Sequence, residues 1–194
     1  MFGVFVDYLH SKGTFTEADI AAIRSRAMVR QLRRRQLLLR QGESWKHYAF
    51  VCEGCLKSYF VDDKGVERIM RFSPEHWWAG DRQSITSGQP SVLNIEALED
   101  STLVMFTLDD FNYLLEALPE MKKMAETLLN RSLMAATNRI QAAISLSGEE
   151  RYQQFAQLYP GLIKRVPQHM IASYLGITPE TLSRIRASLA RRKS

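Results

Sequence analysis

Cysteine and long apolar runs are scarce in this sequence of 194 residues. Its two cysteines, Cys52 and Cys55, are too few for the disulfide framework of a small secreted domain. No apolar run approaches the roughly 20 residues of a membrane-spanning helix. The apolar opening MFGVFV lacks a charged leader and is interrupted by Asp7, which argues against a signal peptide. These absences favour a soluble protein of the reducing cytoplasm with no membrane partner.

Acidic side chains are rarest where basic ones gather. Residues 151–194 contain one acidic residue, Glu180, and eight basic ones, a net charge of +7. The whole chain carries +5, so residues 1–150 carry −2. The basic residues of this segment are Arg151, Lys164, Arg165, Arg184, Arg186, Arg191, Arg192 and Lys193. Such a basic end is the electrostatic footprint of phosphate binding, and a solvated basic tail is the alternative.

The segment VPQHMIASYLGITPETLSRIRASL, residues 166–189, predicts two short helices on either side of one break. Gly176 suits the left-handed residue that ends a helix. Thr178 and Pro179 suit the cap and the first position of the next helix. This pattern predicts a helix-turn-helix, whose second helix enters the major groove of DNA. An ordinary helical hairpin is the alternative interpretation.

The second of these helices has two faces. Three aliphatic residues line one of them, and Glu180, Ser183 and Arg184 lie nearly opposite. Because Arg can bind guanine O6 and N7, Glu can accept from cytosine N4, and Ser can serve either role, these three are the predicted base readers. The predicted contacts to the DNA backbone are Gln168, Thr178, Arg186, Arg191, Arg192 and Lys193.

The rest of the chain changes its periodicity twice. Residues 1–30 predict helices, with Thr16 as a cap. From residue 31 to about residue 108 the period is near two, with turns at QGES, CEGC, DDKG and TSGQP, which indicates a β-sandwich or small barrel. The segments FVCEG and CLKSYFVDDKG are expected to pair. A long helix over residues 119–146 then carries one apolar stripe, which packs on its own domain or on a second copy. The stripe consists of Met121, Met124, Leu128, Ile140 and Ile144.

Taken together, the sequence resembles the Crp/Fnr family of bacterial transcription regulators over essentially its whole length. IASYLGITPETLSRIR is the most specific segment, because Glu180, Ser183 and Arg184 fall where the family's E-x-x-S-R recognition residues fall, as in the Fnr branch. EGCLKSYFVDDKGVERIMRF resembles a hairpin of the family. PSVLNIEALEDSTL resembles a subgroup that is often without a known effector.

The resemblance implies an α+β fold in three parts. Residues 1–117 would form a β-roll sensor domain, a cyclic-nucleotide-binding-like jelly roll with N-terminal helices. Residues 118–146 would form a dimerisation helix. Residues 147–194 would form a helix-turn-helix domain that lacks a terminal β-wing.

The stretch that holds a cyclic nucleotide in relatives departs from their pattern. In AGDRQSITSGQPS, Pro90 stands before Ser91 where a phosphate-binding Arg would be. A phosphate without its guanidinium loses a charge-assisted bidentate bond, so we expect no tight binding of cyclic AMP or cyclic GMP. Asp81, Arg82 and Ser91 are the candidate residues of a different polar pocket, for an unidentified small-molecule effector.

The two cysteines do not predict a metal or a cofactor. Two thiolates cannot ligate an iron–sulfur cluster alone, and a zinc site needs further ligands. We expect both to be half-buried residues of a hairpin. No arrangement of nucleophile and base, phosphate loop or metal spacing indicates an enzyme.

The expected function is that of a sequence-specific DNA-binding transcription regulator, a homodimer on a palindromic operator under the control of an effector. Its expected partners are double-stranded DNA and a second copy of the chain, and RNA polymerase is a further candidate. The alternative is a ligand-sensing module that acts mainly through protein–protein contacts. The basic C-terminal segment favours the first hypothesis, because a protein-docking module does not require it.

Overall fold

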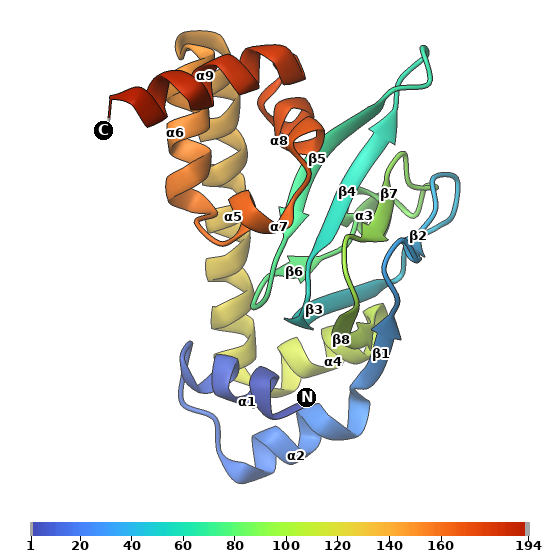
Figure 1. The fold of residues 1–194 in the computed structure, drawn as a ribbon. Coiled ribbons are helices and arrows are strands. Elements are labelled where there is room, and N and C mark those ends of the chain that lie inside the picture. The colour runs from blue at the N-terminus through green and yellow to red at the C-terminus, as the bar shows by residue number, and fades with distance from the viewer. Residues whose placement is uncertain (1, 193–194) are drawn as a thin grey trace. The chain divides into compact units, whose positions relative to one another are not determined.

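The computed structural model describes residues 2–192, which form two compact units: residues 2–60 with 71–130, and residues 61–70 with 131–192 (Figure 1). The elements with residues in the first unit alone are α1 (Phe2–His10), α2 (Glu17–Arg26), β1 (Met28–Leu32), β2 (Leu37–Leu39), β3 (His47–Glu53), β6 (Trp78–Ala79), α3 (Arg82–Ser87), β7 (Asn94–Ala97), β8 (Ser101–Thr107) and α4 (Leu108–Ala117). Those with residues in both units are β4 (Leu56–Val61), β5 (Glu67–Ser73) and α5 (Pro119–Ser145). The second unit also contains α6 (Gly148–Leu158), α7 (Leu162–Arg165), α8 (Gln168–Leu175) and α9 (Pro179–Arg191).

The described strands form two four-stranded sheets, in the orders β1-β8-β3-β6 and β2-β7-β4-β5. Strand β8 pairs antiparallel with β1 and β3, and β7 pairs antiparallel with β2 and β4. The predicted α+β fold with a β-roll, a long helix and a C-terminal helix-turn-helix is therefore confirmed. None of the described helices is both long enough and apolar enough to cross a membrane.

The predicted pairing of the segments around CEGC is wrong, because β3 and β4 belong to different sheets. The chain passes between the sheets at Gly54, whose φ of 92° lies in the left-handed region. A Cβ at Gly54 would lie 2.6 Å from the carbonyl oxygen of Asp100 and 2.3 Å from Oγ of Ser101. Only glycine fits this crossing without strain, since other residues rarely adopt such a φ and no space is left for a side chain.

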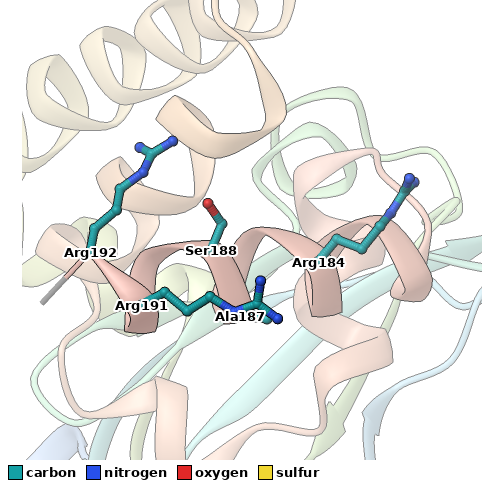
Figure 2. Close-up of a pocket in the computed structure, with 5 residues that line it drawn as sticks. All are labelled: Arg184, Ala187, Ser188, Arg191 and Arg192. Carbon is teal, nitrogen blue, oxygen red and sulfur yellow. The ribbon is translucent and has the colours of Figure 1, made fainter. Parts of the chain in front are cut away.

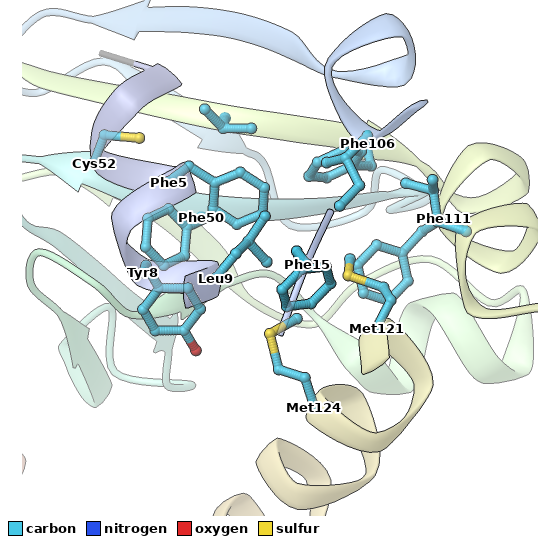
Figure 3. Packing of buried hydrophobic residues seen from close by; sticks show 13 residues of the cluster. Phe5, Tyr8, Leu9, Phe15, Phe50, Cys52, Phe106, Phe111, Met121 and Met124 are labelled. Atoms are coloured by element: carbon cyan, nitrogen blue, oxygen red, sulfur yellow. The ribbon is translucent and has the colours of Figure 1, made fainter. Parts of the chain in front are cut away.

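Two apolar cores lie on the two faces of the sheet that contains β3. Along β3, Phe50 and Cys52 belong to one core, whereas Ala49 and Val51 belong to the other. This division follows the period of two along a strand. Helices α1, α2 and α4 and the start of α5 complete the first core (Figure 3). The second core is filled by the inward residues of both sheets.

The N-terminal helices begin and end where side chains can satisfy the backbone. Thr16 caps α2 as predicted, because its side chain accepts a hydrogen bond from the amide of Asp19. The amide of Thr16 in turn donates to Oδ2 of Asp19 at 2.8 Å. Such a capping box satisfies two amides that have no partner within the helix. At α4, a hydrogen bond from the hydroxyl of Thr107 and another from Arg26 lower the pKa of Asp110.

The predicted single stripe on α5 consists of two different faces. Met121 and Met124 are buried in the first unit's core, and Leu128 packs against it. Ile140 and Ile144 are exposed. At 100° per residue they lie roughly 120–160° around the helix axis from Leu128. The long helix therefore uses one face within its own chain and leaves another face open.

Candidate nucleic-acid interface

The helix-turn-helix in the second unit is built by local capping. Helix α8 ends at Gly176, whose φ of 67° allows its amide to donate to the carbonyl oxygens of Ala172 and Ser173. Two residues later, Oγ1 of Thr178 accepts from the amide of Thr181 at 3.2 Å, and Pro179 opens α9. These features confirm the predicted turn. Pro167 directly precedes the first residue of α8.

Helix α9 packs one face against its own unit. Leu182 is fully buried, and Ile185 is half-buried. Gly148, at the start of α6, lets that helix approach closely, since a Cβ there would lie 3.4 Å from both Ile177 and Ile185. Aliphatic contacts on the buried face of α9 thus fix the position of the helix, and its polar face remains exposed to solvent.

The three predicted base readers lie together on this open face. Glu180, Ser183 and Arg184 are all exposed, in the first two turns of α9. Hydrogen bonds from its own amide and from the side chain of Thr178, with the nearby charge of Arg184, lower the pKa of Glu180. Nη2 of Arg184 donates to Oγ1 of Thr181 at 3.3 Å. The helix start therefore offers a carboxylate acceptor and a cationic donor one turn apart.

The predicted backbone contacts fall into different environments. Arg186 and Arg191 are exposed. Figure 2 shows Arg184 toward one end of α9 and Arg191 and Arg192 toward the other, lining a hollow with Ala187 and Ser188. Nη1 of Arg192 forms an ion pair with Glu149 of α6 at 2.7 Å. Phosphate would have to compete with that carboxylate, so Arg192 is a weaker candidate than Arg191.

The remaining predicted backbone contacts lie at helix starts or outside the described residues. Gln168 is half-buried as the first residue of α8, and Thr178 caps α9. Lys193 lies outside the described residues. No local pattern indicates Glu149 as a partner of Arg192, because the two are 43 residues apart. The sequence analysis did not identify Thr181 as a hydrogen-bond partner of Arg184, although the two are only three residues apart.

Two of the three predicted effector residues contact each other in the first unit. Asp81 caps α3, accepting from the amides of Gln83 at 2.9 Å and Ser84 at 3.3 Å. The hydroxyl of Ser91 donates to Oδ2 of Asp81 at 2.6 Å. Arg82 is exposed. A carboxylate of the chain itself thus binds the backbone donors there, and it would repel an anionic ligand.

The two cysteines are more fully buried than expected, and they flank the crossing between the two sheets, not a hairpin turn. Neither forms a disulfide, and burial raises the pKa of the Cys52 thiol. A raised pKa disfavours the thiolate that redox chemistry and metal binding require. Within residues 2–192, no three His, Cys, Asp or Glu side chains lie close enough together to hold a metal ion.

Comparisons with known proteins agree with this architecture. Residues 29–117 match the family described as "Cyclic nucleotide-binding domain". The transcriptional activator protein anr of Pseudomonas aeruginosa is 26% identical over 170 residues, 80% of this chain and 68% of that protein. The regulatory protein HlyX of Actinobacillus pleuropneumoniae is 25% identical over 167 residues, 77% of this chain and 66% of that protein.

A solved structure extends the likeness beyond the β-roll. FixK2 from Bradyrhizobium japonicum superposes with a TM-score of 0.73 at 19% identity, covering 86% of each chain. A likeness at this identity concerns the fold, and its coverage of 86% extends beyond residues 29–117. In its β-roll, its long helix and its helix-turn-helix, and in these relatives, the chain is similar to transcription regulators of the Crp/Fnr family.

Proposed function

We propose that this protein is a sequence-specific DNA-binding transcription regulator that acts as a homodimer on a palindromic operator. The observation that carries the proposal is the polar face of α9, which exposes Glu180, Ser183 and Arg184 while Leu182 holds the helix from behind. A helix of this kind enters the major groove with its N-terminal residues against the base edges.

The chemistry of that face assigns different roles to its residues. Glu180 is held in its charged form, so it can accept a hydrogen bond from cytosine N4. Arg184 can donate two bonds to one guanine. Arg186 and Arg191, on the flank and at the end of α9, would contact phosphates, with Arg192 as a weaker contributor. The first group would specify the sequence and the second would supply affinity for any sequence.

A second copy of the chain would cover the open face of α5. Leu133, Thr137, Ile140 and Ile144 follow the spacing of four, three and four residues that is typical of a coiled-coil seam. All four are exposed. A two-fold dimer joined along this seam would present two copies of α9 to half-sites about 34 Å apart, one turn of the duplex. The operator would therefore be palindromic, and resemblance to the Fnr branch suggests a half-site like TTGA.

The three-part division at residues 117 and 146 is part of the same proposal, as is control by a small-molecule effector at the β-roll. The internal bond between Asp81 and Ser91 supports a ligand other than a cyclic nucleotide. RNA polymerase is a further proposed partner, and the cytoplasm the proposed compartment. Action mainly through protein contacts remains the second candidate, and the net charge of +7 over residues 151–194 argues against it.

The test is selection of bound sequences from a random duplex library, followed by titrations of matched and mismatched duplexes at two salt concentrations. We expect a palindrome to be enriched. Arg184→Ala should cost roughly 1–3 kcal/mol on it and relax selectivity at one base pair. Arg191→Ala should weaken all sequences alike and reduce the salt slope by about one unit. No enrichment, or a uniform loss with Arg184→Ala, would contradict the assignment.

A further inference from the structure

The tip of the β4–β5 hairpin, residues 61–70, belongs to the same compact unit as the helix-turn-helix. Strand β5 is the last strand of its sheet, so only one of its edges is paired with another strand. The other edge presents backbone N–H and C=O groups that require partners elsewhere. Side chains from two helices of the unit bind this edge.

Ser173 of α8 supplies the first contact. Its hydroxyl donates to the carbonyl oxygen of Glu67 at 3.1 Å and accepts from the amide of Ile69 at 3.1 Å. One side chain thus contacts the donor and the acceptor of alternate residues on β5, as a neighbouring strand would. Ile69 is 2% exposed, so its amide would lose a partner in a position with little water if the hydroxyl were removed.

Arg139 of α5 supplies the second contact. Its Nη1 donates to the carbonyl oxygen of Met70, and its Nη2 donates to that of Ile69 at 3.3 Å and to that of Tyr174 at 3.4 Å. The guanidinium also lies over the ring of Tyr174, 4.4 Å from its centroid. Tyr174 in turn packs against Phe155 of α6, with ring centroids 5.4 Å apart.

The bond to Tyr174 matters because of its place in α8. The last four carbonyl groups of a helix lack partners within it, and a cation there also interacts favourably with the helix dipole. Arg139 therefore caps α8 two residues before Gly176, the residue at which the chain turns toward α9. Its planar group of five donors suits such simultaneous contacts, which the single ammonium of a lysine cannot reproduce.

We propose that Arg139 and Ser173 are positioning residues for DNA reading. They hold α8 on the edge of β5, and through the short turn at Gly176 they hold α9 in one orientation. Neither residue contacts DNA in this scheme. The inference rests on the proposed function, since what is being positioned is the base-reading helix. It goes beyond the proposed function by giving a role to the contact between the tip of the β4–β5 hairpin and the helix-turn-helix.

The first experiment tests, without DNA, the bracket that Arg139 and Ser173 form on the edge of β5. Amide hydrogen exchange on the full-length protein should show faster exchange at Ile69 in Ser173→Ala, by about tenfold, the effect of one lost hydrogen bond. Ser173→Thr keeps the hydroxyl and should restore the slow exchange. Unchanged exchange in Ser173→Ala would overturn the contact. This result is independent of whether the protein binds DNA, so failure of the proposed function and failure of the bracket can be distinguished.

The second experiment measures DNA binding with the sequence selected above. Arg139→Lys keeps the charge and loses the planar donors, and we expect it to lower affinity about tenfold on matched and mismatched duplexes alike. Because Arg139 is placed away from phosphates, the salt slope should stay unchanged. Arg131→Lys, an exposed arginine on the same helix, is the matched control and should bind like the unaltered protein.

Three outcomes would overturn the proposal. A salt slope reduced by about one unit in Arg139→Gln, which removes the charge, would make Arg139 a phosphate contact. Higher affinity in Arg139→Lys would mean that the bracket holds α9 in an orientation that does not read DNA. Equal affinities of Arg139→Lys, Arg131→Lys and the unaltered protein would mean that the bracket does not affect reading.

Discussion

The open face of α5 leads to a quantitative prediction about assembly. Ile140 retains 63% of its surface exposed, Leu133 59% and Ile144 83%. Full burial of an isoleucine side chain is worth about 1.5–3 kcal/mol, so each copy of Ile140 has about 1–2 kcal/mol left to gain on burial in a seam. Ile140→Ala in both copies should cost about 2–3 kcal/mol, a rise in the dimer dissociation constant of roughly 30- to 150-fold.

Sedimentation velocity over a range of concentrations measures that constant. Leu158→Ala in α6 is the matched control, because Leu158 is exposed to a similar degree, 55%, away from the seam. Leu128 is a poor choice for this test, since it packs against the core of its own chain and its loss would destabilise the fold. A monomer at micromolar concentration, or equal effects of the Ile140 and Leu158 variants, would refute the argument.

Three further predictions concern charged groups. Calorimetry should detect no micromolar binding of cyclic AMP, because the carboxylate of Asp81 binds the donors at the start of α3; such binding would contradict that view. Glu149→Gln should release Arg192 for phosphate and strengthen DNA binding, and the gain should vanish in the double variant with Arg192→Ala; a gain that persists would exclude the ion pair as its cause. The lowered pKa of Asp110 stabilises the fold above the ordinary carboxyl pKa and ceases to do so as pH falls through the lowered value. Thermal melts should therefore separate Asp110→Asn from the unaltered protein at neutral pH and bring the two together in acid; equal melting temperatures at neutral pH would contradict this.

The features that could be predicted from the sequence depend on neighbours along the chain. The cap at Thr16, the left-handed Gly176 and the start of α9 at Pro179 each depend on residues within one turn, and the structure has all three. The separation of Leu182 from Glu180 also follows from helix periodicity. The change from a period near 3.6 to a period near two located the β-roll for the same reason.

The features that could not be predicted depend on residues far apart in the sequence. Strands β3 and β4 are neighbours in the sequence, and their pattern predicts a hairpin, but they belong to different sheets. At Gly54, where the chain crosses between the sheets, Asp100 and Ser101 approach the backbone closely. The contact between Ser173 and Ile69 joins residues 104 positions apart. No local pattern marks either residue, because the geometry that brings them together is set by the whole fold.

Because Cys52 and Cys55 flank the crossing between the sheets and are buried, the reactivity of their thiols can report local unfolding. Cys52 is 5% exposed and Cys55 1%, so a thiol-reactive dye can reach them only after the structure around the crossing opens. Where closing is faster than labelling, the labelling rate measures the equilibrium population of that open form, in the manner of amide exchange. The labelling rate thus reports how often the structure around Gly54 opens, and candidate effectors can be screened by whether they slow the dye.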